Sequence, residues 1–414
     1  MDSEFLMKQL EANNIRVIYD SPPEKAKTAI INTCGFIKDA KQESIDTILQ
    51  FVKAKEEGLI KYLYVIGCLS ERYKQELKAS IQGVDRYFGT EDMHSILSEI
   101  GVDYKKELTG ERLLTTPSHY AYFKISEGCD RSCSFCAIPL MRGMHKSKSI
   151  ETLVAEAESL SAKGVKELIL IAQDLTYYGI DLYGRQKLAD LLKYISDIKG
   201  IEWIRLHYAY PANFPRSVVN VIRERKNICK YLDIPFQHIN DKILKQMKRG
   251  VNKRQIYDLI GFIRDEIPGI ALRTSMMIGF PGEGEKEFEE LKEFVRDVKF
   301  DRLGVFTYSE EDGTWSAANL KNTIPEHIKR KRADIIMEEQ MSISKLLNYN
   351  KIGQLIKVIV DDRAGAYYIC RSEFDSPEVD DEILVRSQNI RLETGKFYKV
   401  RIYAADEYDL YGEV

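Results

Sequence analysis

The chain has 414 residues and a mass of 47.8 kDa, a length that suggests two to four domains and excludes a small disulfide-stapled module. Its 61 basic and 64 acidic residues nearly balance, so no overall field attracts the protein to nucleic acid or to an anionic membrane. No run approaches the ~18 consecutive apolar residues that cross a bilayer, and the start lacks the features of a signal peptide. We therefore expect a folded cytoplasmic protein whose seven cysteines are metal ligands or core residues.

Residues 1–110 predict a small doubly wound α/β domain. Helical patterns and apolar strand-like segments alternate there, with helices expected at 3–13, 39–57 and 70–79 and strands at 15–19, 28–32 and 61–67. A doubly wound sheet usually opens with a strand, whereas this chain begins directly on a helix. We therefore expect that the first strand and its loop are missing and that the domain is truncated at its N-terminus. Gly101, Gly110 and Pro117 mark 101–118 as a linker.

Six repeats of an apolar strand and a helical pattern dominate residues 119–345. The strands are predicted near 120–126, 166–172, 201–208, 229–234, 270–278 and 302–307. The helices are predicted near 150–163, 186–199, 215–226, 240–249, 252–267 and 284–297, and a basic helical stretch follows at 325–350. Such alternation predicts a parallel sheet with right-handed crossovers. Six units are too few to close an eight-stranded barrel, so we expect an open, partial (β/α)6 TIM-like barrel with its active site at the carboxyl ends of the strands.

The last segment, residues 351–414, has a different pattern. Short alternating strands separated by turn residues are predicted at 355–360, 366–371, 382–386 and 397–403, which is typical of a small antiparallel β-barrel. This segment contains 9 basic and 13 acidic residues, a balance of the wrong sign for binding phosphates. The predicted fold class is therefore α/β throughout most of the chain, with a C-terminal antiparallel barrel.

The strongest chemical signal is the C-x3-C-x2-C string formed by Cys129, Cys133 and Cys136, directly after the first barrel strand. Cysteine thiolates in close array hold iron–sulfur clusters or zinc. Three thiolates on one loop leave one iron of a cubane cluster free to bind a substrate. The alternative is a structural zinc site whose fourth ligand is a distant histidine such as His207 or His238.

Two further cysteines, Cys34 and Cys68, each follow an apolar strand at the start of a helical pattern. Because the loops after neighbouring parallel strands converge on one crevice, these two thiols are candidates to share a cluster, although two buried thiols without a metal would also fit the pattern. Cys229 and Cys370 lie inside predicted strands without cysteine neighbours, so we expect them to be core residues.

A C-x3-C-x2-C loop after the first strand of a partial barrel resembles the radical S-adenosylmethionine superfamily. The order of an N-terminal α/β domain with cysteines, a radical domain and a small barrel of the TRAM type resembles the methylthiotransferases and covers essentially the whole chain. The resemblance implies a [4Fe-4S] cluster on Cys129, Cys133 and Cys136 whose free iron binds S-adenosylmethionine (SAM), and a 5′-deoxyadenosyl radical that abstracts hydrogen from the substrate.

Local strings select a branch of that family. The strings AIPLMRG, AQDLTYYG, LHYAYP and LDIPFQH, at 137–143, 172–179, 206–211 and 232–238, resemble the branch that methylthiolates the β-carbon of an aspartate in ribosomal protein S-twelve. The strings typical of the branch that modifies tRNA adenosine are absent from the sequence. The acidic C-terminal segment also suits a basic ribosomal protein better than tRNA, so nucleic acid is not an expected partner.

The resemblance also implies an auxiliary [4Fe-4S] cluster that supplies or relays sulfur. Cys34 and Cys68 match its second and third ligands, and the first ligand of the family lies just upstream of an Asp-Ser-Glu string. Here Asp2, Ser3 and Glu4 follow the initiating methionine, so we expect this ligand to be missing. We therefore expect a chain that cleaves SAM and inserts sulfur poorly, with an auxiliary cluster that is absent, labile or completed by another ligand.

Five residues are candidates for contacts with SAM. Gly279 and Glu283 lie in a glycine-rich turn at a strand end, which by resemblance lies beside the adenosyl group, although such turns are also common as simple connections. Gln173 and Asp174 are placed to bond the ribose or the methionine amine, and Arg273 to clamp a carboxylate. Two basic patches are more typical of solvated faces. The first comprises Arg142, His145, Lys146 and Lys148. The second comprises Lys245, Lys248, Arg249, Lys253 and Arg254, and it is the candidate surface if the protein binds RNA.

The predicted enzyme consumes two SAM molecules, one for the radical and one for the methyl group. Its expected partners are ribosomal protein S-twelve, a flavodoxin-like or similar electron donor and a sulfur donor, with no membrane, and we expect a monomer. Two rival functions remain open at this point. One is a tRNA adenosine methylthiotransferase, for which salt-sensitive tRNA binding would be diagnostic. The other is a metal-stabilised adaptor that contains zinc and does not cleave SAM.

Overall fold

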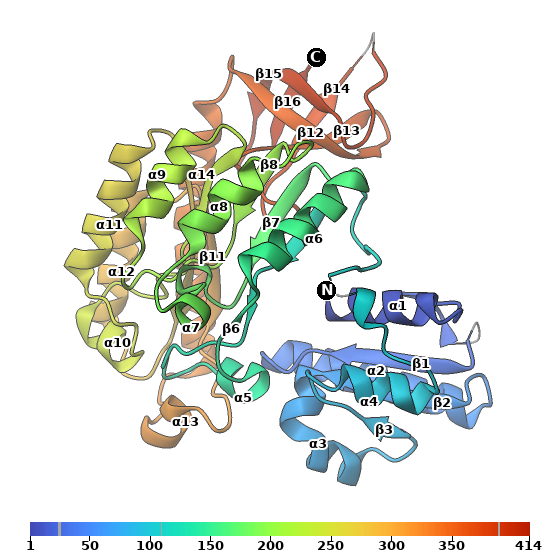
Figure 1. Ribbon diagram of the computed structural model, residues 1–414. Helices are drawn as coiled ribbons and strands as arrows, with labels where there is room; N and C mark the ends of the chain where they lie inside the picture. Colours follow the sequence, from blue (N-terminus) through green and yellow to red (C-terminus); the bar gives the residue numbers. More distant parts are fainter. Residues whose placement is uncertain (24–25, 109, 388–389) are drawn as a thin grey trace.

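The computed structural model describes residues 1–23, 26–108, 110–387 and 390–414. An N-terminal α/β domain, a central partial barrel and a C-terminal closed barrel follow one another along the chain (Figure 1). The fold class predicted from the sequence is therefore confirmed. Residue 109 of the predicted linker lies outside the described residues. Among the helices that the structure describes, none combines the length and the apolar character needed to span a membrane.

The N-terminal domain contains a three-stranded parallel sheet in the order β1-β2-β3. Its elements are α1 Asp2–Ala12, β1 Thr28–Thr33, α2 Lys38–Glu56, β2 Tyr62–Gly67, α3 Cys68–Ser80, β3 Arg86–Tyr87 and α4 Met93–Ile100. The strand predicted at 15–19 is wrong. Ile15 and Val17 pack against the apolar side chains of α1 and α4, but their backbone joins no sheet. Alternating apolar residues thus gave a strand-like pattern to an extended loop. The short strand β3 and helix α4 were not predicted.

The central domain is a six-stranded parallel sheet in the order β11-β10-β9-β8-β7-β4, open between its two edge strands. Its strands are β4 Tyr120–Lys124, β7 Glu167–Ile171, β8 Trp203–Leu206, β9 Ile228–Asp233, β10 Ala271–Ile278 and β11 Arg302–Thr307. Its main helices are α6 Ile150–Ala162, α8 Leu188–Ser196, α9 Arg216–Glu224, α10 Asp241–Gln246, α11 Lys253–Glu266, α12 Glu285–Val298 and α14 Glu326–Tyr349. All six predicted strands and all seven predicted helices are confirmed.

Smaller elements decorate this barrel: the pair β5 Ser126–Glu127 and β6 Lys146–Ser147, and the helices α5 Ile138–Arg142, α7 Ile180–Tyr183 and α13 Trp315–Asn319. Alternation along each barrel strand directs apolar side chains outward against the helices, where they form one continuous core. The helix starts are fixed locally. Ser149 caps α6 by accepting from Thr152 N, and Asn252 and Gln255 form a capping box on α11.

The C-terminal domain is a closed five-stranded barrel in the order β12-β13-β14-β16-β15. Its strands are β12 Leu355–Ala364, β13 Tyr367–Ser372, β14 Ile383–Arg386, β15 Phe397–Ala405 and β16 Leu410–Glu413. Four of them were predicted, and β16 was not. This fifth strand closes the barrel by pairing antiparallel with β15 and parallel with β14, so one of the five pairs is parallel rather than antiparallel. Because the barrel is closed, each of its five described strands pairs with a neighbour on both sides.

The C-terminal barrel docks on the amino ends of the central strands, opposite the end that carries the cysteine loop (Figure 1). Glu167, the first residue of β7, is fully buried between Arg205 of β8 and Arg371 of β13, at 2.8 and 2.5 Å. Trp203 packs edge to face on Phe397 of β15, with ring centroids 4.9 Å apart. Paired charges and an edge-to-face ring contact therefore join the two barrels.

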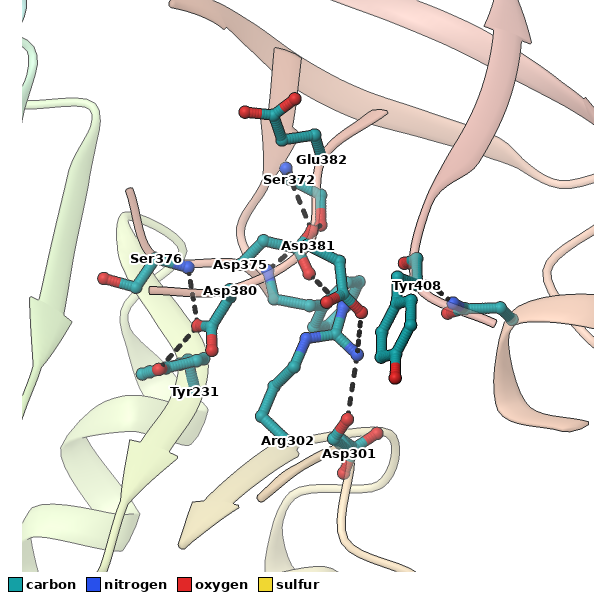
Figure 2. Close-up of polar contacts among 12 residues, drawn as sticks. Tyr231, Asp301, Arg302, Ser372, Asp375, Ser376, Asp380, Asp381, Glu382 and Tyr408 are labelled. Carbon is teal, nitrogen blue, oxygen red and sulfur yellow. Dashed lines mark hydrogen bonds and ion pairs between the residues drawn. The ribbon is translucent and has the colours of Figure 1, made fainter. Parts of the chain in front are cut away.

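Carboxylates of the loop between β13 and β14 also face the central barrel. Figure 2 shows Arg302, the first residue of β11, between Asp375 at 2.5 Å and Asp381 at 3.2 Å. Asp380 accepts from Tyr231 at 2.7 Å and lies 3.3 Å from Arg273. With these three carboxylates and Arg371 directed inward, eight basic and ten acidic residues of 351–414 remain. Much of the acidic excess thus serves this interface instead of a partner, which weakens the charge argument made from the sequence.

Asp381 gives this interface a pH dependence. Burial raises the pKa of Asp381 to about 6, and the charge of Asp375 adds to the shift while Arg302 opposes it. Because the ordinary pKa is about 4, Asp381 stabilises the fold below pH 4 and loses that contribution as the pH rises through 6. We expect Asp381→Asn to gain about 1–2 kcal/mol of unfolding free energy relative to the wild type between pH 4.5 and pH 7. Urea denaturation at both pH values measures this, and an equal difference at the two pH values would contradict it.

Candidate active site

The three cysteines after β4 lie on one compact loop. The loop closes on itself because Cys129 N donates to Gly143 O at 3.1 Å and Cys136 N donates to Cys133 O at 3.2 Å. Gly128 has a φ of +74°, and a Cβ there would fall 2.1 Å from the carbonyl oxygen of Met144. Only glycine fits this position, so Gly128 determines the backbone conformation with which the chain enters the cysteine loop.

The three thiols interact electrostatically. Burial raises the pKa of Cys129 to about 11, with the charges of Asp174 and Cys133 adding to the shift. Burial raises the pKa of Cys136 to about 12, and the charges of Cys133 and Cys129 contribute again. Without a bound cation Cys129 and Cys136 would stay protonated at neutral pH. A donor set of this kind is suited to iron, whose positive charge favours the thiolates.

Cys133 has polar partners that the sequence did not reveal. Arg249, which is buried behind the loop, donates from Nη1 to Cys133 Sγ at 3.3 Å. The hydroxyl of Tyr210 lies 3.5 Å from the same sulfur and donates to Arg249 O at 2.8 Å. The sequence placed Arg249 in a basic patch on a solvated face, and that prediction is wrong for this residue. Tyr210 belongs to the LHYAYP string, and its place in that string was the one sequence feature that could have marked it as a site residue.

Asp174 and Gln173, which follow β7, lie beside the cysteine loop. Asp174 is buried, and its carboxylate accepts from Arg131 Nε at 2.8 Å and from Thr176 N and Oγ1 at 2.8 and 2.7 Å. Gln173 donates from Nε2 to Glu127 Oε1 at 2.9 Å, while its Oε1 is buried without a hydrogen-bond partner in the described part of the chain. Gln173 therefore offers a free acceptor, and Asp174 is occupied in holding Arg131.

The glycine-rich turn after β10 is locked by its own residues. Gly279 has a φ of +75°, and a Cβ there would fall 2.3 Å from Lys329 Cγ. Gly279 N donates to Glu283 Oε2 at 2.9 Å, and Arg332 Nη1 donates to Glu283 Oε1 at 2.9 Å. The turn thus presents backbone at the mouth of the barrel, and Glu283 maintains its shape from within. Contacts of these two residues with SAM stay predictions.

Arg273 lies five residues before the end of β10, separate from the turn. Its Nη1 lies 3.4 Å from Asp233, the last residue of β9, and its Nε lies 3.3 Å from Asp380. Burial raises the pKa of Asp233 to about 6, against the opposing charge of Arg273. The guanidinium therefore already faces two carboxylates of the protein, and the structure does not bring it together with Gly279. Its clamp on a carboxylate of SAM stays a prediction.

Cys34 and Cys68 lie side by side at the carboxyl end of the N-terminal sheet. Thr33 and Gly67, which precede them, are paired in register between β1 and β2. A Cβ on Gly35 would fall 2.8 Å from the backbone carbon of Cys68, so the two loops touch. Burial raises the pKa of Cys68, and the nearby charge of Cys34 contributes to the same shift. The convergence expected from the order of strand and loop is therefore present.

Arg142 connects the two cysteine loops. It ends α5, which begins two residues after Cys136, and it donates from Nε to Cys68 Sγ at 3.2 Å. Its Nη1 pairs with Asp2 at 2.7 Å and lies 3.4 Å from Glu127. The prediction that Arg142 belongs to a solvated basic patch is wrong, since it bridges two domains.

A zinc site with a histidine ligand finds no support. Among the described residues, no group of three His, Cys, Asp or Glu side chains has the arrangement that a single metal ion needs. His207 Nε2 bonds Ser376 Oγ at 2.8 Å, and His238 Nδ1 accepts from Ile239 N and Asn240 N. The other ring nitrogen of His238, Nε2, is buried without a hydrogen-bond partner among the described residues and lies 3.6 Å from Glu283 in the turn after β10. Neither histidine contacts the cysteine loop in the part of the chain that the structure describes.

Comparisons with known proteins agree with this geometry. Residues 123–295 match the radical SAM superfamily, residues 352–414 the TRAM domain, and residues 1–89 the uncharacterized protein family UPF0004. The structure of the radical SAM methyltransferase TsrM from Kitasatospora setae, with cobalamin and a [4Fe-4S] cluster bound, has a similar fold. Its TM-score is 0.53 at 13% identity, over 74% of this chain and 71% of that one. The fold and the cysteine loop thus define a radical SAM enzyme.

Full-length relatives narrow this class. The ribosomal protein uS12 methylthiotransferase RimO of Phocaeicola vulgatus is 53% identical over 414 residues, which cover all of this chain and 96% of the relative. The proteins of the same name from Bacteroides fragilis and Cytophaga hutchinsonii are each 54% identical, over 96% and 94% of their lengths. The chain belongs to the RimO family of radical SAM methylthiotransferases. It is an iron–sulfur enzyme that uses SAM.

Proposed function

We propose that this enzyme methylthiolates the β-carbon of an aspartate in the small-subunit ribosomal protein uS12. The observation that carries the proposal is identity of 53–54% along the whole chain to relatives named for uS12. The strings LHYAYP and LDIPFQH support the same branch by their resemblance. Both lie at the site, because Tyr210 of the first contacts Cys133 and Asp233 of the second contacts Arg273. The charge of the C-terminal barrel no longer carries weight, because part of it is buried in the interface.

Cys129, Cys133 and Cys136 are proposed to hold the [4Fe-4S] cluster that binds SAM, and Cys34 and Cys68 to contribute two ligands of an auxiliary [4Fe-4S] cluster. When bound, these clusters supply the electron that cleaves SAM and the site at which sulfur is presented. Support comes from the proximity of the thiols within each set: Cys136 feels the charges of Cys133 and Cys129, and Cys68 feels the charge of Cys34. Arg142 keeps the two loops in a fixed relation, because it donates to Cys68 and lies on the helix that follows Cys136.

For SAM itself, the free Oε1 of Gln173 is suited to an ammonium or ribose hydroxyl, and the backbone of Gly279 to a close adenosyl group. Asp174 and Glu283 are proposed to act through the groups they hold, Arg131 and the turn. One SAM would yield the radical, and a second would donate the methyl group. A separate sulfur donor and a one-electron donor of the flavodoxin class complete the reaction, and the protein acts as a monomer.

The three bodies are proposed to be domains with limits 1–110, 119–345 and 351–414. The N-terminal domain presents Cys34 and Cys68, the central domain binds SAM, and the TRAM barrel seals the amino end of the central strands. The fully buried Arg205–Glu167–Arg371 group keeps water out at that end. Exclusion of water and of competing hydrogen donors is the protein's main contribution to radical chemistry.

The test uses the anaerobically reconstituted enzyme with SAM, sulfide and dithionite. Its substrates are uS12, uS12 with the target aspartate replaced by asparagine, and an adenosine-containing tRNA. We expect 5′-deoxyadenosine and a methylthio mass increase with uS12 and with neither other substrate. The yield of the methylthio product should be low, because only two auxiliary ligands, Cys34 and Cys68, are identified. Modification of the tRNA instead, with binding that weakens steeply between low and moderate salt, would establish the tRNA branch and overturn the proposal.

A further inference from the structure

Residues 247–249 lie directly behind the cysteine loop and hold it at two points. Met247 O accepts from Ser134 N at 3.0 Å, and Arg249 donates to Cys133 Sγ at 3.3 Å. Lys248 between them has a φ of +55°, a left-handed conformation that a lysine adopts at an energetic cost. The surrounding contacts therefore maintain a strained backbone that places Arg249 against the sulfur.

The Arg249 guanidinium is a buried cation with an unused donor. Its Nη2 donates to Pro235 O, whereas its Nε is buried without a hydrogen-bond partner in the part of the chain that the structure describes. Its Cζ lies 4.3 Å from the ring centroid of Tyr210, and the Cζ of Arg131 lies 4.2 Å from the same centroid. A buried cation without a carboxylate partner is costly unless a negative group lies close by.

We propose that Arg249 is a positioning residue that sets the reduction potential of the cluster on Cys129, Cys133 and Cys136. The inference rests on the cluster ligation proposed above. In the reductive step one electron passes from the flavodoxin-class donor to the oxidised cluster, whose negative charge grows by one, and no bond forms or breaks. A fixed cation with an N–H donor at a ligand sulfur stabilises the reduced form, and this raises the potential. The enzyme then needs a less strongly reducing donor.

The test compares wild type, Arg249→Gln and Arg249→Lys, each reconstituted without SAM. All of these proteins are made in a background variant, the carrier, in which Cys34 and Cys68 are both replaced by alanine. This background removes the auxiliary site, so that only the cluster on Cys129, Cys133 and Cys136 is observed. The fraction of reduced cluster is measured by electron paramagnetic resonance at fixed potentials set with titanium(III) citrate. Arg112→Gln is the control, because Arg112 is similarly buried, but its guanidinium pairs with Glu4 at 2.7 Å and does not contact the cysteine loop among the described residues.

We expect the ratio of reduced to oxidised cluster to fall at least about tenfold in Arg249→Gln, equivalent to about 59 mV for one electron. Arg249→Lys keeps the charge and should lose less than about threefold, and Arg112→Gln should match the wild type. A ratio within twofold of wild type in Arg249→Gln, at equal iron content, would overturn the inference and leave the ligation intact. Absence of a cluster in the carrier itself would instead refute the ligation. If Arg249→Gln does not fold, Arg249→Met, which also removes the charge, takes its place. The same fall of at least about tenfold is expected, and a ratio within twofold of wild type would overturn the inference.

Discussion

Cys133→Ala is expected to lower formation of 5′-deoxyadenosine by more than about 100-fold, since losing a ligand exceeds the 10–100-fold cost of losing an outer partner. The same change should remove iron from the reconstituted protein, and it leaves Arg249 without its sulfur partner. The measurement is chromatography of 5′-deoxyadenosine after reduction with dithionite, together with an iron assay. Undiminished cleavage of SAM in this variant would contradict the proposal that Cys133 is a ligand of the cluster that binds SAM.

Two matched cysteine variants sharpen that result. Cys370→Ala changes a fully buried cysteine in the core of the C-terminal barrel and should leave both iron at the cysteine loop and SAM cleavage unchanged. Cys68→Ala lies in the other cysteine loop and should retain SAM cleavage while the methylthiolated product is lost. If all three variants lost cleavage equally, the effect would be one of folding, which thermal denaturation would reveal.

Arg302→Met is expected to cost about 3–5 kcal/mol of unfolding free energy, the range for removing one partner of a buried ion pair. Asp375 is buried and would keep its charge without the guanidinium 2.5 Å away, and Asp381 would lose the same partner (Figure 2). Urea denaturation measures the loss, and limited proteolysis is expected to release the C-terminal barrel first. Both measurements report on the contact between the two barrels, because Arg302 belongs to β11 of the central barrel and both aspartates belong to the C-terminal domain.

Its control is Arg254→Met, which removes an exposed arginine paired only loosely with Asp258 at 3.7 Å and should cost less than about 0.5 kcal/mol. The double variant Arg302→Met with Asp375→Asn removes both charges and is expected to recover part of the loss. A cost below about 1 kcal/mol for Arg302→Met alone would mean that the two barrels are held mainly by apolar contacts such as Trp203 on Phe397.

Most secondary structure of the central barrel followed from periodicity. Buried parallel strands are continuous apolar runs and their covering helices are amphipathic, so both repeat with a clear period. The failures occurred where that signal is weak. The two-residue strand β3 is too short to show a period, and residues 15–19 alternate like a strand while packing as a loop. Strand β16 near the end of the chain offers four residues, too few to separate from a turn.

Charge was the least predictable property of the site. Arg142 and Arg249 stand in basic stretches of sequence that resemble solvated faces, yet one bridges to Cys68 and the other is buried against Cys133. Asp375, Asp380 and Asp381 gave the C-terminal segment an acidic balance, yet they face the central barrel. Whether these charges meet solvent or a buried partner depends on residues 73 to 116 positions away, which no local pattern encodes.

The sequence by itself determined the chemistry of the candidate site, because metal-binding residues on one loop are close in space whatever the rest of the chain does. Cys129, Cys133 and Cys136 are such a set: their spacing predicted an iron–sulfur or zinc site, and their place after the first barrel strand carried the resemblance to radical SAM enzymes. The tertiary structure alone decided which side chains support that loop and how the barrels meet. Arg249 reaches Cys133 across more than a hundred residues of chain, and Asp2 reaches Arg142. Such contacts depend on packing between distant segments, and only the folded chain brings those segments together.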